Sequence, residues 1–340
     1  VFVTGVSPLA LNDLTSGFNT ATDVSLEPEL AGLCGFYKTE LRDLLELIAE
    51  ERGMSEEDVE RFVDVMRVWY NGYRFSPRDR GPLVYNPTNS LYFMREVYRH
   101  GELPVQLHDA NLRTDQAKLA FLARTNAGTG LVEELTEGTG EIRIPRLLDT
   151  FSLDDVVERL GKDRGAVASF LYYMGLLTLT EVPGRLRIPN LVVRKLFLDR
   201  LLEILLPRPE ASSEAREIAL DFFEDGNLLP LLAFFEEKLL PILSNRDLGM
   251  PPKKPGQGGG GVNETFFKGL FLSLLFDDQR FVLHSELEVE RGHIDLCLLA
   301  RPESRYRDAF DILFELKFVR RTELGKKGEE LRTLDEAELR

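Results

Sequence analysis

Apolar residues recur at helical spacing over much of the amino-terminal third of the chain. One such pattern ends at Gly53, and Ser55 then opens a second helix with the acidic residues of a capping box. A third helix is expected near 88–99, after an aromatic-rich connection at 69–87. The run from 1 to 6 is instead apolar and β-branched, which is typical of a buried parallel strand. Because a lone strand is unstable, we expect its sheet partners upstream, in a longer protein.

The pattern from about 112 to 250 is mainly helical, with one exception at 170–190. There a helix is expected to end near Gly175, and two short strands are expected on either side of a Pro-Gly turn. A helix followed by a β-hairpin is typical of a winged-helix unit. Such units bind DNA in some proteins and only pack against neighbours in others, and Arg185 and Arg187 are the basic residues here.

The clearest boundary is the Pro- and Gly-rich stretch at 251–262, which favours a linker. Beyond it, an apolar helix is expected to begin at Glu264, and three strands follow at about 281–287, 294–299 and 309–318. The order helix, strand, strand, strand predicts a small α/β domain.

Composition and charge narrow the classes of function. A chain of 340 residues and 38.7 kDa predicts two or three compact units. The net charge of −15 disfavours a protein that coats nucleic acid by global attraction, so a nucleic-acid partner would need a local basic patch. No apolar run reaches the length of a membrane span, and the two cysteines lie far apart in sequence. We therefore expect an intracellular protein without a membrane partner. The sequence does not indicate its compartment.

Candidate chemistry gathers in the last three predicted strands. Side chains alternate along a strand, so Glu315 and Lys317 point to the same side. If the strands pair so that Asp295 lies across from Glu315, two carboxylates converge, and oxygen ligands of this kind suit Mg²⁺ or Mn²⁺. Glu264, from the preceding helix, could bind the same metal directly or through water. The ammonium of Lys317 would position a metal-bound water or offset charge on a phosphoryl group.

These residues resemble a known family. The blocks 263–264, 285–286, 292–296 and 314–317 are similar to the PD-(D/E)xK nuclease domain that follows AAA-ATPase-like domains in a large group of proteins. The blocks 2–8, 14–19, 69–75 and 85–87 are similar to the end of the ATPase-like domain itself.

The resemblance implies a metal-dependent nuclease with Asp295, Glu315 and Lys317 as catalytic residues. It also implies that Thr4 lies at a nucleotide-sensor position. The chain contains no Walker A motif, so ATP is expected only in a longer form. His293 stands where relatives carry Arg.

The expected fold is therefore α/β and multidomain. It comprises the remnant of a P-loop AAA-like domain with its helical lid at 1–105, a helical and winged-helix region at 106–250, the linker at 251–262, and a restriction-endonuclease-like PD-(D/E)xK domain at 263–340. The expected reaction is Mg²⁺-dependent hydrolysis of phosphodiester bonds in DNA or RNA. The alternative is a non-catalytic signalling or interaction protein with degenerate ATPase and nuclease folds.

Each candidate side chain also has a structural alternative. Asp295 could simply accept a backbone N–H near the start of a strand. Glu264 could be an acidic residue of the first helical turn, where the helix dipole favours a negative charge. Glu286 could support the site or lie on a solvated edge, and His293 could contact phosphate or the solvent. The aromatic residues at 69–75 are expected to pack in a core rather than to stack on bases. A basic cluster at 317–327 could contact nucleic acid or form a solvated helical face.

Overall fold

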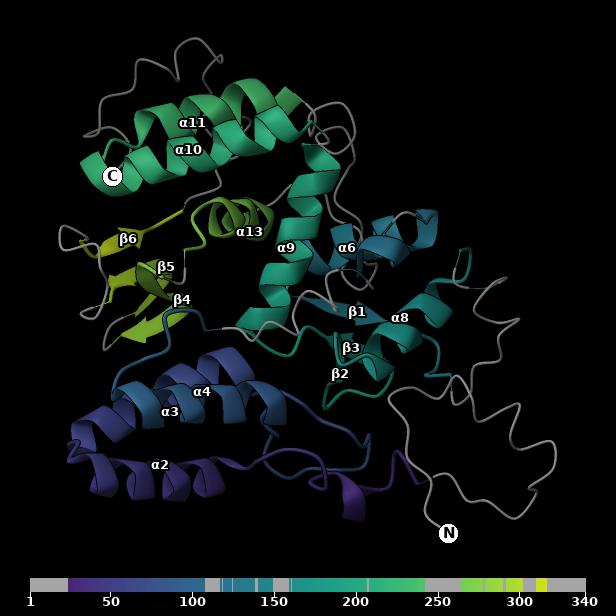
Figure 1. Ribbon diagram of the computed structural model, residues 1–340. Helices are drawn as coiled ribbons and strands as arrows, with labels where there is room; N and C mark the ends of the chain where they lie inside the picture. The colour runs from purple at the N-terminus through teal and green to yellow at the C-terminus, as the bar shows by residue number, and fades with distance from the viewer. Residues whose placement is uncertain are drawn as a thin grey trace.

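The protein has a mixed α/β fold that is mostly helical, with two small antiparallel sheets (Figure 1). The computed structural model describes residues 24–107, 117, 119–123, 125–137, 140–148, 159, 161–206, 208–241, 264–277, 279–289, 292–301 and 310–316. Three predicted features lie outside these residues. They are the opening strand with Thr4, the linker, and Lys317 with the basic cluster that follows it.

Three helices form the first layer, at the bottom of Figure 1. After a short 3₁₀ turn at Pro28–Leu30, they are α2 (Lys38–Arg52), α3 (Glu56–Tyr70) and α4 (Pro87–His100). Gly53 ends α2 in the left-handed conformation, with φ of 68°. Ser55 caps α3 by accepting a hydrogen bond from the backbone N–H of Asp58 at 3.2 Å. Both helix boundaries confirm the prediction from the sequence.

The aromatic connection after α3 packs inside the protein. Trp69 and Tyr70 are fully buried and Tyr73 is 5% exposed. The hydroxyl of Tyr70 donates to the carbonyl of Leu107 at 2.7 Å, so its polar end is also satisfied. Core packing, rather than stacking on bases, is therefore the confirmed role of this segment.

The middle of the chain holds the first sheet. Its elements are α6 (Asn126–Glu137), β1 (Glu141–Arg143), α8 (Arg164–Tyr173), β2 (Thr178–Leu179) and β3 (Arg185–Arg187). The strands are antiparallel in the order β1-β3-β2. A helix that ends just before Gly175, followed by a β-hairpin around Gly184, was predicted and is confirmed; the pairing of β1 with β3 is a further feature.

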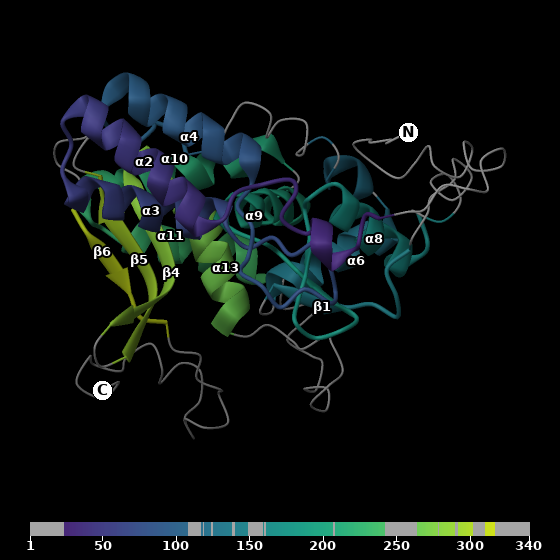
Figure 2. The ribbon, with the colours of Figure 1, turned by 90° about the horizontal axis from the view of Figure 1, so that it is seen from below.

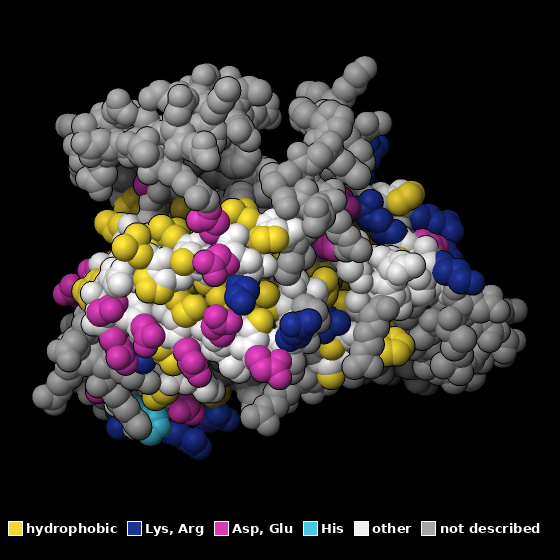
Figure 3. Space-filling model, turned by 90° about the horizontal axis from the view of Figure 1, so that it is seen from above, with side chains coloured by type: hydrophobic (Ala, Val, Ile, Leu, Met, Phe, Trp, Pro, Cys, Tyr) yellow, Lys and Arg dark blue, Asp and Glu magenta, His cyan; other side chains and the backbone are white. Residues whose placement is uncertain are grey.

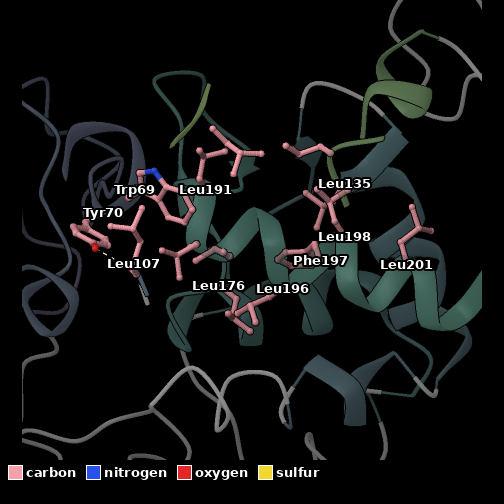
Figure 4. Close-up of a cluster of buried hydrophobic side chains, with 14 of the residues drawn as sticks. Trp69, Tyr70, Leu107, Leu135, Leu176, Leu191, Leu196, Phe197, Leu198 and Leu201 are labelled. Carbon is pink, nitrogen blue, oxygen red and sulfur yellow. Dashed lines mark hydrogen bonds between the residues drawn. The ribbon is translucent and has the colours of Figure 1, made fainter. Parts of the chain in front are cut away.

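Helix α9 (Leu191–Leu205) lies at the centre of the molecule. Its apolar residues point in several directions, so that Leu191 lies towards Trp69 of α3 while Leu198 lies towards Leu135 of α6 (Figure 4). Two further helices, α10 (Pro209–Asp225) and α11 (Leu229–Phe234), form the top layer in Figure 1, and α11 continues into a π-helical turn at Phe235–Leu239.

The second sheet follows α13 (Glu264–Leu274). It consists of β4 (Phe281–Val289), β5 (Gly292–Ala300) and β6 (Ile312–Phe314) in the antiparallel order β4-β5-β6. The predicted order helix, strand, strand, strand is confirmed.

The third strand is shorter than the sequence predicted. It was expected over 309–318, whereas β6 covers only Ile312–Phe314. Side chains explain both described ends. The carboxylate of Asp311 accepts the backbone N–H of Ala300 at 2.8 Å, and the carboxylate of Asp295 accepts that of Leu316 at 2.9 Å. Carboxylates thus take backbone donors beside both ends of the short ladder.

This second sheet lies between the α10–α11 layer and the α2–α4 layer (Figures 1 and 2). Towards α10, the rings of Phe223 and Phe281 lie 4.9 Å apart. Towards α4, the buried guanidinium of Arg301 donates to the carbonyls of Pro104 and Val105 at 2.5 and 3.2 Å. The sheet is therefore attached to helical segments that are distant in the sequence.

One cluster of buried apolar residues extends through the described chain. It includes Leu41 of α2, Leu131 of α6, Phe197 of α9, Leu270 of α13 and Leu296 of β5. The cluster crosses both of the domain boundaries expected from the sequence. Among the described residues, no helix is long and apolar enough to cross a membrane.

Candidate functional site

The candidate site lies where α13 meets the β4–β5–β6 sheet. Glu264 is the first residue of α13, and Lys268 follows it by four positions, so both belong to one face of the helix. The side chain of Glu264 lies outside the described part of the structure. The side chain of Lys268 is described, is only 7% exposed, and reaches the sheet.

Strand β5 is buried on both faces. Leu296 and Leu298 are fully buried on one face, and Cys297, which shares the other face with Asp295 by alternation, is 1% exposed, whereas the side chain of Asp295 is 19% exposed. The apolar residues of β5 thus favour a strand here, and the alternation of side chains along that strand determines the face on which Asp295 lies.

The strand registers place two further acidic positions beside Asp295. Leu296 pairs with Phe314, the last residue of β6, and the next step of the same register would bring Asp295 opposite Glu315, which is exposed. On the other side, the pairs Ser285 with Leu296 and Leu287 with Ile294 leave position 286 opposite Asp295. Opposite positions in antiparallel strands belong to the same face.

If both registers are extended by one pair, positions 286, 295 and 315 align across the sheet. The pairing of Asp295 with Glu315 was the condition set by the sequence analysis, but the β5–β6 ladder ends one pair before it, at Leu296 with Phe314, so this pairing stays a prediction. The place of Glu286 in the same row was not predicted. Like charges in directly opposite positions repel each other. A row of this kind therefore favours a nearby cation.

Two protein donors hold the carboxylate of Asp295. The ammonium of Lys268 lies 3.1 Å from Oδ1, and the backbone N–H of Leu316 donates to Oδ2 at 2.9 Å. Partial burial of Asp295 raises the pKa of its carboxyl group, but these two hydrogen bonds and the charge of Lys268 outweigh that effect. The net pKa of Asp295 lies below its ordinary value, so the group is ionised at neutral pH.

Lys268 is the residue of this site that the sequence analysis missed. Its only sequence signal is a lone basic residue in an otherwise apolar helix, one turn after Glu264. A buried ammonium costs free energy unless it is paired. Its burial beside Asp295 identifies it as part of the site.

A hard divalent cation stays a prediction for this site. Carboxylate oxygens are the ligands that Mg²⁺ prefers, and one or two of them commonly suffice alongside water and substrate phosphates. The ammonium of Lys268 already lies beside the Asp295 carboxylate and offsets its charge. Among the side chains that the structure describes, no group of three or more His, Cys, Asp or Glu is placed to hold a metal; the side chains of Glu264 and Glu286 are not among them.

The remaining candidates are placed only in part. His293 lies on β5 opposite Glu288, but its side chain lies outside the described part, as does the whole of Lys317. The structural alternative for Asp295 is partly realised, because the residue does accept a backbone N–H. Its contact with a buried lysine from another element goes beyond that alternative.

Comparison with known proteins adds little to this geometry. No family model matches the chain, and no solved structure matches it. An uncharacterised protein in the vnfD 5′ region of Azotobacter chroococcum mcd 1 is 26% identical over 215 residues, which are 61% of this chain and 35% of that protein. The chain thus spans about a third of the length of this relative.

Proposed function

We propose that the protein is a nuclease of the PD-(D/E)xK type that hydrolyses phosphodiester bonds with Mg²⁺ or Mn²⁺. The observation that carries the proposal is the contact of Lys268 from α13 with Asp295 on β5, in a sheet whose registers, extended by one pair, align acidic positions 286, 295 and 315. In this proposal the middle region is a winged-helix unit, and the amino-terminal helices derive from an AAA-ATPase-like lid.

The proposed chemistry divides among these side chains. Asp295 and Glu315 would hold the metal through their carboxylates, with Glu264 as a third ligand, direct or through water. The chemistry that Mg²⁺ would supply there is polarisation of the phosphodiester and a lower pKa of a coordinated water. Lys317 orients the attacking water or offsets the charge that grows on the phosphoryl oxygens. Glu286 belongs to the proposed support of the site, and His293 to its contact with phosphate.

Lys268 is proposed as a positioning residue. Its ammonium fixes one oxygen of Asp295, while the Leu316 N–H fixes the other. A carboxylate that is held in place loses less side-chain entropy when a cation binds. Lys268 also offsets the repulsion within the acidic row.

The test is cleavage of labelled DNA and RNA with Mg²⁺ or Mn²⁺, and with EDTA as the control. We expect cleavage by the wild type that is lost in Asp295→Asn, Glu315→Gln and Lys317→Ala. The chain provides a matched control in Glu236→Gln, because Glu236 and Lys238 have the same spacing as Glu315 and Lys317 but lie on a helical segment. Cleavage that persists in Asp295→Asn would exclude this site as its source.

One observation favours the second candidate, a non-catalytic interaction protein. Both oxygens of Asp295 already accept hydrogen bonds from protein donors. A degenerate site would keep such contacts for stability alone. In that case neither Mg²⁺ nor Mn²⁺ supports cleavage of any nucleic acid, and Asp295→Asn changes only stability.

A further inference from the structure

The first sheet has an exposed basic face. The register of β1 and β3 pairs Ile142 with Leu186 on the buried side and Arg143 with Arg185 on the other side. Both arginines are exposed. Arg187 follows on the same face of β3 by alternation, but it is only partly exposed, its Nε is buried, and Thr178 opposite it on β2 is 1% exposed. Two exposed guanidinium groups, with a third partly buried beside them, thus share one face of a small sheet in a chain whose net charge is −15.

This face carries an excess of positive charge. Glu141 lies opposite Arg187 and approaches the guanidinium of Arg185 at 3.4 Å, so one acid faces three bases. Within the described residues no acidic group forms an ion pair with Arg143 or Arg187. Like charges in directly opposite positions, here Arg143 and Arg185, are unfavourable without a counter-charge. An external anion would relieve that repulsion.

The helix next to this sheet is not available for reading bases. Most of α8 is buried, including Ala166, Val167 and Tyr172. The hydroxyl of Tyr172 donates to the backbone carbonyl of Phe75 at 3.0 Å. The hydroxyl of Tyr73 donates to the backbone carbonyl of Gly175 at 3.2 Å. The aromatic connection after α3 therefore covers this helix. Contacts from the sheet arginines alone can reach phosphates but carry no sequence information.

The arrangement of the molecule suits a long polyanion. The basic sheet and the β4–β5–β6 sheet lie on opposite sides of α9 in both ribbon views (Figures 1 and 2). On the face seen from above, Lys and Arg side chains gather towards the end at which α6 and α8 lie and also at the lower left, and acidic ones are most frequent between these two groups (Figure 3). A short acidic peptide would not need both regions, but a nucleic acid could extend from one to the other.

We propose that the exposed β1–β3 face formed by Arg143 and Arg185, with Arg187 at its partly buried edge, binds the phosphate backbone of a nucleic-acid duplex without regard to its sequence. As the substrate-holding surface of a nuclease, it rests on the proposed function. Binding itself requires neither a metal nor cleavage, so the two can be tested apart.

The test is fluorescence anisotropy with two labelled duplex DNAs of unrelated sequence, in EDTA, over a series of salt concentrations. The variant is Arg143→Gln with Arg185→Gln. The matched control is Arg95→Gln with Arg99→Gln, which removes the same charge from exposed positions on α4. Circular dichroism verifies that both variants are folded.

We expect equal affinity for both duplexes. We also expect the slope of log K against log salt to fall by about two in the sheet variant, because each substituted arginine no longer neutralises a phosphate. The control variant should retain most of the slope. Wild-type affinity in the sheet variant, an equal loss in the control, or binding of polyglutamate in preference to DNA would overturn the proposal. Normal binding with no cleavage in Mg²⁺ would instead refute the nuclease and leave this surface standing.

Discussion

At the scale of single residues, the ion pair of Lys268 and Asp295 sets the character of the site. The lysine is almost fully buried, and the aspartate keeps a fifth of its side-chain surface exposed. Removing the two charges from water costs free energy, which their mutual attraction and the Leu316 N–H bond to Asp295 offset. Replacing one partner by an uncharged residue leaves the other charge buried without its counter-charge, which destabilises the protein.

A double-mutant cycle measures this pair. We expect Lys268→Met to lower the free energy of unfolding by about 1–3 kcal/mol, because Asp295 then keeps a single donor. We expect Lys268→Met and Asp295→Asn to be strongly non-additive in denaturant unfolding. The exposed pair Asp64 and Arg67 is the control, with a coupling of about 0.5 kcal/mol or less. Additivity within about 0.5 kcal/mol at positions 268 and 295 would show that the pair is not formed.

The residue scale also separates what the sequence could predict from what it could not. Asp295 was placed on its strand correctly because apolar runs reveal strands locally, whereas the roles proposed for Asp295 and Glu315 stay predictions. Lys268 was missed because a single lysine in a helix is usually solvated, and only the fold reveals that this one faces an aspartate 27 positions away. Glu286 was recognised as a candidate, but its place in the acidic row depends on the register.

At the scale of elements, helix ends are set by short-range contacts that the sequence displays. The carboxylate of Asp163 accepts the backbone N–H groups of Gly165 and Ala166 at 2.8 and 3.2 Å, and so begins α8. The hydrogen bond from Arg159, with those from the two N–H groups, lowers the pKa of Asp163, although burial opposes the shift.

This cap predicts a pH-dependent effect. We expect Asp163→Ala to cost about 1 kcal/mol of stability at neutral pH, and Asp163→Asn to cost less because the amide oxygen still caps. The folded pKa of Asp163 is depressed, so the stabilisation from its charge is complete above the ordinary value of 3.8 and is lost as the pH falls through the folded value. Urea unfolding at neutral and acidic pH measures the difference. A gap between Asp163→Asn and the wild type that widens on acidification would contradict this assignment.

Two glycines give a matched test of backbone conformation. Gly53 has φ of 68° and Gly130 lies in α6, and a methyl group at either position would meet no atom within 4 Å. We expect Gly53→Ala to destabilise the protein by about 1–2 kcal/mol through left-handed strain, and Gly130→Ala to stabilise it by about 0.5–1 kcal/mol. Thermal unfolding by circular dichroism compares the two. Stabilisation in both variants would show that Gly53 is not a left-handed cap.

Strand length was the poorest prediction at this scale. The apolar pattern from 309 to 318 continues past the end of the ladder at Phe314, because a local pattern cannot show that the Asp295 carboxylate competes for the Leu316 N–H. Helix boundaries such as Gly53 and Ser55 were predicted well because their caps depend on adjacent residues.

At the scale of the whole molecule, one apolar cluster joins the parts that the sequence divides into domains. The single tryptophan, Trp69, is fully buried in α3 and contacts the ring of Phe276 beyond α13, with ring centroids 5.4 Å apart. Composition could predict how many units the chain length supports, but not which apolar faces meet. Those contacts link segments that are about 200 residues apart.

The continuous core predicts cooperative unfolding. We expect the transition followed by Trp69 fluorescence to coincide with that followed by far-ultraviolet circular dichroism, because the ring of Trp69 in α3 packs against Phe276, which follows α13. Guanidinium titration with both probes measures this. Two separated transitions would show that the expected domains unfold independently, as a chain with weak internal interfaces does.

The central claim is that Asp295 and Glu315 belong to one site for a divalent metal. Because that claim does not depend on which nucleic acid is cleaved, its most direct test is the binding of Mn²⁺, followed by electron paramagnetic resonance of the free ion. The account predicts saturable binding to the wild type and to Glu236→Gln, and its loss in Asp295→Asn and in Glu315→Gln. Wild-type protein that leaves all Mn²⁺ free, or variants at 295 and 315 that bind it as the wild type does, would contradict the account.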